Sequence, residues 1–133
     1  MTVTNKGLGN DVEVTVSAGA STVINFDGVV VDNDGKTIAA PHVIDCWLTS
    51  DATGATLNTV SSSNFTIQTS AATLLNPTSA TTSLYITILT LADGTFGVQV
   101  TDSSPETLAY FCCTVPGSDR VSITQFASTD FGA

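Results

Sequence analysis

The sequence predicts an all-β protein, folded as a single antiparallel β-sandwich of the immunoglobulin-like type, with a small β-barrel or a jelly roll as the alternative. Three observations predict this class. Apolar and polar residues alternate in one segment after another, which is the pattern of a half-buried strand. Turn-forming residues separate these segments. The polar residues are mainly hydroxyls, with 14 Ser and 23 Thr against two Glu and two Lys. Threonine suits a pleated sheet surface better than a helix.

Four strands are predicted in the first half of the chain, over residues 11–17, 22–31, 42–50 and 64–69. The second of them places Ile24 and Phe26 on one face. The third places Ile44, Cys46 and Leu48 on one face and Val43, Asp45 and Trp47 on the other. Either face could point inward. Because a lone large aromatic residue usually anchors packing, we expect Trp47 in the core.

Four more strands are predicted over residues 84–91, 95–101, 108–115 and 120–126. Residues 95–101 alternate most cleanly, with Phe96, Val98 and Val100 on the inner face. Residues 116–119 read Pro-Gly-Ser-Asp, so the last two strands are expected to form a hairpin. Residues 71–75 are the one candidate for a short helical turn, which Pro77 would end.

The length of 133 residues suits a single domain. Neither an internal repeat nor a domain boundary is evident. We expect an N-terminal arm over residues 1–10, a β-sandwich domain over residues 11–127 and a C-terminal tail over residues 128–133.

The charge balance excludes some classes of partner. Only Lys6, Lys36 and Arg120 are cationic, against twelve carboxylates, for a net charge of -9. Such a surface repels phosphates, so neither a nucleic acid nor a membrane is an expected partner. No apolar run reaches the roughly 18 residues that span a bilayer. The first residues lack the apolar core of a signal peptide, so synthesis in a cytoplasm is expected.

The three cysteines are an odd set. Cys112 and Cys113 are adjacent on a predicted strand, so their side chains point to opposite faces and at most one can join Cys46 in the core. A Cys46–Cys112 bridge between the sheets is one option. A reducing compartment and an unpaired third thiol favour three reduced cysteines instead.

Sites for metals, cofactors and catalysis are not predicted. Three cysteines and His42 add up to a Cys₃His set, but adjacent cysteines do not suit one tetrahedral ion. The run Asp32-Asn33-Asp34-Gly35 resembles part of a calcium loop, yet it lacks the terminal glutamate and is typical of a turn. His42 is the only histidine, so any Ser-His-Asp triad would need it. The sequence has no Gly-x-Ser-x-Gly motif that would place a nucleophilic serine. We therefore expect a protein that is not an enzyme.

Three segments carry a resemblance to a known family: Asp45-Cys-Trp-Leu-Thr-Ser-Asp-Ala-Thr-Gly-Ala55, Leu91-Ala-Asp-Gly-Thr-Phe-Gly-Val-Gln-Val-Thr-Asp102 and Val115-Pro-Gly-Ser-Asp-Arg-Val121. In turn placement and strand order they resemble the compact immunoglobulin-like domains of tailed-bacteriophage structural proteins. Such domains serve as capsid decoration (cement) proteins, head fibres or parts of tail proteins. The resemblance spans roughly residues 43–127, and it carries over no functional residue.

The leading hypothesis is therefore a capsid decoration protein that binds and stabilises the outer surface of a tailed-phage head. Its partners would be the major capsid protein or other virion subunits, and its location the capsid surface. A homo-oligomer is expected, with a trimer favoured by the symmetry of capsid sites. The arm and the tail are the expected attachment elements, with Val3, Leu8 and Phe131 as apolar contacts to the partner.

The alternative hypothesis is a carbohydrate-binding or adhesion module of a tail fibre or a bacterial surface protein. Trp47, Tyr85 and Tyr110 would then form a platform on which sugar rings stack. This hypothesis requires that Trp47 is not fully buried.

Overall fold

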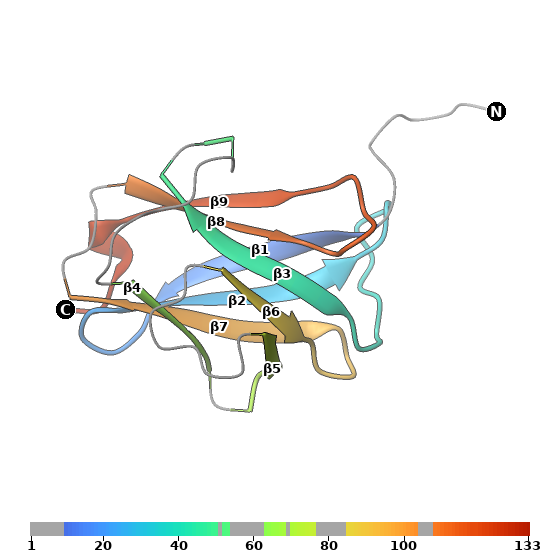
Figure 1. The fold of residues 1–133 in the computed structure, drawn as a ribbon, viewed down its shortest axis with the longest axis horizontal. Helices are drawn as coiled ribbons and strands as arrows, with labels where there is room; N and C mark the ends of the chain where they lie inside the picture. Colours follow the sequence, from blue (N-terminus) through green and yellow to red (C-terminus); the bar gives the residue numbers. More distant parts are fainter. Residues whose placement is uncertain (1–9, 51, 54–62, 69, 77–84, 104–107) are drawn as a thin grey trace.

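The computed structural model describes residues 10–50, 52–53, 63–68, 70–76, 85–103 and 108–133. These residues form strands and one short 3₁₀ helix, η1 (Ser128–Asp130), drawn in Figure 1. The strands are β1 (Asp11–Ala18), β2 (Val23–Val31), β3 (Val43–Thr49), β4 (Ser63–Ile67), β5 (Thr73–Asn76), β6 (Tyr85–Leu89), β7 (Thr95–Asp102), β8 (Leu108–Thr114) and β9 (Ser122–Ala127).

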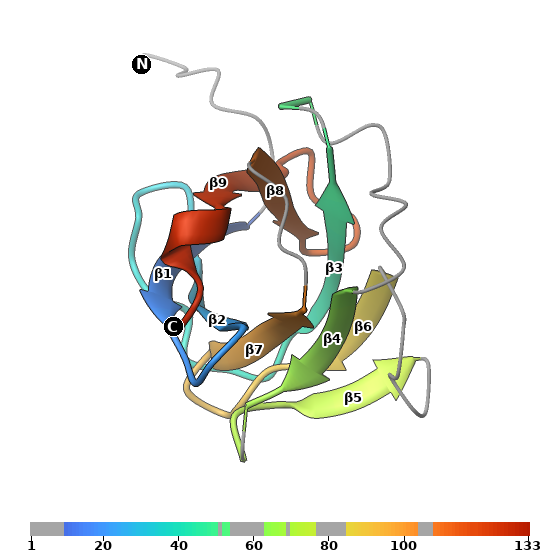
Figure 2. The same cartoon turned by 90° about the vertical axis from the view of Figure 1, so that its left-hand side faces the viewer.

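Two antiparallel sheets pack against each other. One has four strands in the order β1-β2-β7-β4, and the other has five in the order β5-β6-β3-β8-β9. Figure 2 looks along the sandwich and shows the two layers curving around the core. The predicted all-β sandwich is confirmed. The barrel alternative is not, because the strands form two separate sheets and not a closed ring.

The strand order is that of a variable-type immunoglobulin sandwich in most positions. Strands β1, β2, β3, β7, β8 and β9 stand where such a domain has A, B, C, E, F and G. The connection between β3 and β7 differs. Here the chain first forms β4, in the position of D, and then β5 and β6, in the positions of C″ and C′. The positions match the immunoglobulin pattern, whereas the path between them does not.

The core forms where the inward faces of the two sheets meet. Phe26 of the four-stranded sheet stacks on Phe111 of the five-stranded sheet, with ring centroids 4.3 Å apart. Phe126 and Phe65 meet this pair edge-on. The residues expected inward on β2 and β7 are fully or nearly fully buried, as alternation predicted: Ile24, Phe26, Phe96, Val98 and Val100. The hairpin predicted around residues 116–119 is the β8–β9 pair.

One predicted element is wrong. Residues 71–75 do not form a helical turn, because the chain there enters β5, which pairs with β6. Leu74 packs against the core while Thr73 and Leu75 are exposed, which is the alternation of a strand. β5 has only four residues and a register shift between Leu74 and Asn76, too short for its period to be read from sequence.

Candidate functional site

The outer surface of the five-stranded sheet is apolar, and it is the candidate functional site. Five large apolar side chains, each between 38% and 47% exposed, point outward from this sheet or its immediate flank. Together with the half-buried Trp47 they define what we call the apolar face: Val43, Trp47, Tyr85, Leu108, Val121 and Ile123. Exposed apolar side chains gathered on one side of a sheet are typical of an interaction surface.

A single row of residues crosses the middle of the apolar face at right angles to the strands. From β6 to β9 it reads Tyr85, Trp47, Cys112 and Ile123, each directly opposite the next in the antiparallel register. The Trp47 and Tyr85 rings stack with centroids 6.2 Å apart and planes 20° from parallel. Cys112, the smallest residue of the row, lies between Trp47 and Ile123 and is fully buried by its surroundings.

The expectation that Trp47 lies in the core is wrong. Ile44, Cys46 and Leu48 are the buried set of β3, so strand alternation turns Trp47 to the outside. Its ring stacks on that of Tyr85 on the neighbouring strand. Trp47 is half-buried, so the condition set by the carbohydrate hypothesis is met.

One carboxylate interrupts the apolar face. Asp45 Oδ1 accepts a hydrogen bond from the Thr87 hydroxyl across the β3–β6 pair, at 2.8 Å. Partial burial, and then the nearby Asp45 charge and a hydrogen bond to it, raise the pKa of Tyr85 above its usual value. The phenol therefore stays protonated and donates to Asp45. The result is a small polar site beside an aromatic pair.

The three cysteines are buried and form no disulfide. Cys46 lies opposite Cys113 on the adjacent strand, and both are in the core, whereas Cys112 is on the outer side. The Cys46–Cys112 bridge offered as an option is therefore wrong, because these two side chains lie on opposite faces of one sheet. Burial raises the pKa of Cys46 and of Cys113, so both are poor thiolate nucleophiles and metal ligands.

The four-stranded sheet presents a different surface. An open depression of about 360 Å³ lies against it, and Glu13 and Asp27 are the two carboxylates that line it. The Gln68 side chain reaches over Gly97 and donates to Asp27 Oδ1 at 3.1 Å. This side of the molecule is acidic and hydroxylated, in contrast to the apolar face.

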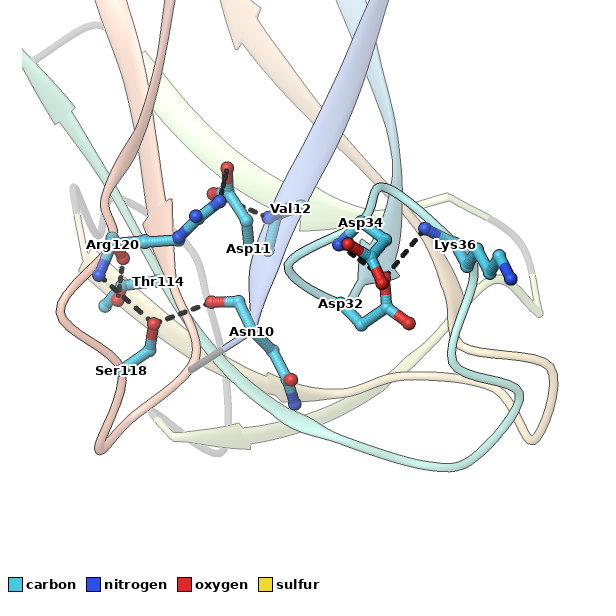
Figure 3. A network of polar contacts seen from close by, with 9 residues as sticks. All are labelled: Asn10, Asp11, Val12, Asp32, Asp34, Lys36, Thr114, Ser118 and Arg120. Atoms are coloured by element: carbon cyan, nitrogen blue, oxygen red, sulfur yellow. Dashed lines mark hydrogen bonds and ion pairs between the residues drawn. The ribbon is translucent and has the colours of Figure 1, made fainter. Parts of the chain in front are cut away.

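The point where the N-terminal segment joins the domain is fixed by polar contacts, shown in Figure 3. The Ser118 hydroxyl in the β8–β9 turn donates to the Asn10 carbonyl at 2.6 Å. Arg120 forms an ion pair with Asp11, with Nη1 3.6 Å from Oδ2. The last described residue before β1 is thus held against the turn of the opposite sheet.

The run that resembles a calcium loop is a turn, as its composition favoured. Asp32 Oδ1 accepts hydrogen bonds from the backbone N–H groups of Asp34 and Lys36, at 2.8 and 3.0 Å (Figure 3). These two bonds lower the pKa of Asp32. Gly35 adopts the left-handed conformation that the turn requires, with φ of 80°. The Asp32 carboxylate is thus a hydrogen-bond acceptor within its own turn.

Phe131 does not lie where an attachment contact would. Its ring is 9% exposed, packs against Phe126 with centroids 6.0 Å apart and belongs to the core of its own domain. The tail is fastened beyond it, because Gly132 N donates to Val23 O and Gly132 O accepts from Thr22 N. A side chain used in this way is not available to a partner. Val3 and Leu8 lie outside the described residues.

His42 is a structural neighbour of β3 and not part of a polar cluster. Its backbone N–H donates to the Thr90 hydroxyl at 2.9 Å, and its carbonyl accepts from Thr90 N. Within the described ranges no three His, Cys, Asp or Glu side chains gather as a metal site would require. These contacts are made by the backbone of His42, whereas its imidazole Nε2 is buried without a hydrogen-bond partner among the described residues.

The composition of β8 carried a signal that reasoning from the sequence missed. This strand reads Leu-Ala-Tyr-Phe-Cys-Cys-Thr and is apolar on both faces. A two-layer sandwich has only one inner side, so a strand with two apolar faces indicates that its outer face is covered by something else. The outward Leu108 and its neighbour Ile123 on β9 could have been found in this way.

Comparisons with known proteins add no relative on which a function could be based. Neither a family model, nor a curated protein, nor a solved structure matches this chain. In the part of the chain that is described, no helix is long and apolar enough to cross a bilayer. The function must therefore be argued from the surfaces described above.

Proposed function

We propose that this protein is a non-enzymatic structural protein of a virion, and specifically a decoration (cement) protein on the outer surface of a tailed-phage head. Its partner is the major capsid protein or another subunit of the shell. The observation that carries the proposal is the division of the molecule into an acidic, hydroxyl-rich side and one apolar face. Such a division suits a subunit with one side in solvent and another against protein.

The contacts that hold Asn10 and Asp11, where the N-terminal segment joins the domain, support the same proposal. Asn10 and Asp11 are tied to Ser118 and Arg120, so any segment preceding them leaves the domain from a defined point. An arm with a fixed origin loses less conformational freedom on binding than one that hangs from a frayed strand. We therefore assign attachment to residues 1–9, and no longer to Phe131, which serves the core.

A cement protein acts by mass action. Each copy that binds the assembled shell and not its free subunits lowers the free energy of the assembled state. The contribution is small for a single copy and is repeated at every equivalent site. Binding and positioning are the only roles that this mechanism asks of the chain, and a rigid sandwich performs both.

The test uses heads of the phage that encodes this chain. Full-length protein and a variant lacking residues 1–9 are added to heads stripped of the protein, and bound copies are quantified after gradient purification. We expect saturable binding of the full chain and at least a tenfold weaker occupancy for the shortened one. Asn10 is kept in both because Ser118 binds its carbonyl. Absence of the protein from purified virions contradicts the proposal.

A second candidate function is favoured by one observation. The stacked Trp47–Tyr85 pair on the outside of the sheet, with Asp45 and Thr87 beside it, has the composition of a sugar-binding site. Aromatic faces pack against the C–H side of a sugar ring, and a carboxylate accepts its hydroxyls. The proposal in this form is a carbohydrate-binding module of a tail fibre or bacterial surface protein.

A glycan array followed by calorimetry tests the second candidate. We expect Trp47→Ala to abolish binding while Ile123→Ala, a truncation on the same face two strands away, retains it. Both variants should keep the far-ultraviolet spectrum of the parent. A parent chain that binds no glycan on the array rules this function out.

A further inference from the structure

We propose that two copies of this chain associate through their apolar faces, sheet against sheet, about a two-fold axis that runs parallel to the strands. The inference names a contact of the isolated chain with itself, and it goes beyond the virion function proposed above. Attachment to the shell is there assigned to residues 1–9, so in the dimer the protein that covers the apolar face is the second copy. Three properties of the face support it: the scarcity of its charges, its size, and the way its central row fits its own rotated copy.

The distribution of carboxylates determines which surface of the chain can contact the same surface of a second copy. The chain carries a net charge of -9, so two copies repel each other wherever their carboxylates come close. On the outer sides of β6, β3, β8 and β9 the one carboxylate is Asp45, which already accepts the Thr87 hydroxyl. Glu13 and Asp27 lie on the other sheet. Contact through the apolar faces therefore brings fewer carboxylates together than contact through the outer side of the four-stranded sheet, and it covers exposed apolar side chains.

The size of the face sets the strength of the contact. Four strands side by side are about 19 Å wide, and seven residues along them are about 24 Å long. The flat footprint of two such faces is roughly 900 Å², near the lower limit for specific protein interfaces. A contact of this size is typical of a weak, reversible association.

The central row is complementary to itself under the proposed rotation. An axis between β3 and β8 brings β6 of one copy over β9 of the other, so that Tyr85 meets Ile123 of the second copy. The same rotation sets the bulky Trp47 over the position of Cys112, the smallest residue of the row, in the second copy. Large therefore meets small along the row, and sheets packed face to face permit this alignment.

The same rotation also keeps the one carboxylate of these strands away from its own copy. Asp45 lies opposite Thr114 within the sheet, so in the dimer it faces Thr114 of the second copy and not a second carboxylate. The Thr114 hydroxyl already donates to the Arg120 carbonyl at 2.7 Å, so it adds no bond to Asp45. The arrangement keeps the two Asp45 carboxylates apart, which would repel each other in an apolar contact. A face-to-face contact of this kind closes as a dimer, in place of the trimer expected from capsid symmetry.

Sedimentation equilibrium of the purified chain between about 10 μM and 1 mM tests the inference. We expect the average mass to rise from monomer toward dimer. The variant Ile123→Asp should weaken association at least tenfold, because it places a charge against Tyr85 of the second copy. The matched control is Ser17→Asp, which adds the same charge on the exposed side of β1 and should leave the Kd within twofold. Val121→Asp repeats the test if Ile123→Asp is not folded.

Cross-linking tests the direction of the axis. A chain carrying Tyr85→Cys is mixed with one carrying Ile123→Cys under oxidised glutathione. We expect the mixed disulfide in at least fivefold excess over either homodimer, because the rotation brings these two positions together. The three native cysteines are buried, so both chains keep them unchanged.

Four results overturn the inference: a monomer at 1 mM, a trimer, equal effects of Ile123→Asp and Ser17→Asp, or no preference for the mixed disulfide. If a monomeric chain binds a glycan and Trp47→Ala removes that binding, the inference is overturned and the sugar-binding function is favoured. The experiment needs no virion. A monomeric chain that still decorates heads overturns only this inference, and a dimer that binds no head overturns only the proposed function.

Discussion

At the scale of single residues, the environment of each side chain, and not its type, decides its behaviour. The adjacent Cys112 and Cys113 differ in this way. Cys113 lies in the core opposite Cys46, while Cys112 lies on the outer side within 3.7 Å of the Thr49 hydroxyl. Sequence identifies three thiols but not their surroundings, and the surroundings set both pKa and reactivity.

The buried thiols predict alkaline destabilisation. Burial raises the folded-state pKa of Cys46 and Cys113 above the ordinary value of about 9.0, so the unfolded chain loses these protons first. Their contribution is complete below pH 9 and is lost as pH rises above it, by up to about 1.4 kcal/mol per pH unit for each thiol. Urea unfolding under reductant from pH 8 to 10 should show the decline. Cys46→Ala should remove about half of the slope, and an unchanged slope would contradict this account.

Two turn glycines predict different costs for the same substitution. Gly94 and Gly117 both have left-handed backbones, with φ of 81° and 90°. A Cβ at Gly94 would overlap the Ile38 carbonyl oxygen, whereas one at Gly117 meets nothing within 4 Å. We expect Gly117→Ala to cost about 1 kcal/mol of unfolding free energy and Gly94→Ala at least about twice that. Chemical denaturation measures both, and equal costs would show that the close approach is unimportant.

At the scale of elements, the C-terminal segment is part of the sandwich. Phe131 fills the core beside Phe126, and Gly132 lies so close to the β1–β2 turn that a Cβ there would overlap the carbonyl oxygens of Gly19 and Ala20. A segment that reads as a small polar tail is thus held by one aromatic ring and two backbone hydrogen bonds.

Removing that ring should therefore destabilise the domain. We expect Phe131→Ala to lower the unfolding free energy by about 3 kcal/mol, the lower end of the range for a buried phenylalanine, because the ring lies at the margin of the core. Ile123→Ala, an exposed truncation on β9, should cost less than about 1 kcal/mol. If Phe131→Ala left stability unchanged, the ring would again be a candidate contact for a partner.

At the scale of the whole molecule, the excess of negative charge is the dominant electrostatic fact. A net charge of -9 on one small domain favours the expanded chain through self-repulsion, and salt screens it. We expect the Tm of dilute protein to rise by a few degrees between 10 mM and 0.5 M KCl. Calorimetry measures the change, and a falling Tm would mean that attractive pairs such as Arg120–Asp11 outweigh the repulsion.

The sequence by itself determined the class of fold and most of its strands. Alternation needs only the two-residue period of a strand, so Ile24, Phe26, Val98 and Val100 could be assigned inward before any contact was known. Composition likewise determined the acidic character of the surface. Local turn chemistry predicted the turn at Asp32 and the β8–β9 hairpin, because both depend on neighbours in the chain.

Only the tertiary structure decided which of two apolar sets faces the core and what the other set does. Ile44, Cys46 and Leu48 of β3 are buried in the core against the opposing sheet. Trp47 therefore points outward, where its ring stacks on that of Tyr85. Phe131 is buried because Phe126 and the β1–β2 turn lie next to it in space. The sequence period defines the two faces of a strand, whereas the energy of packing against distant residues decides which face is buried.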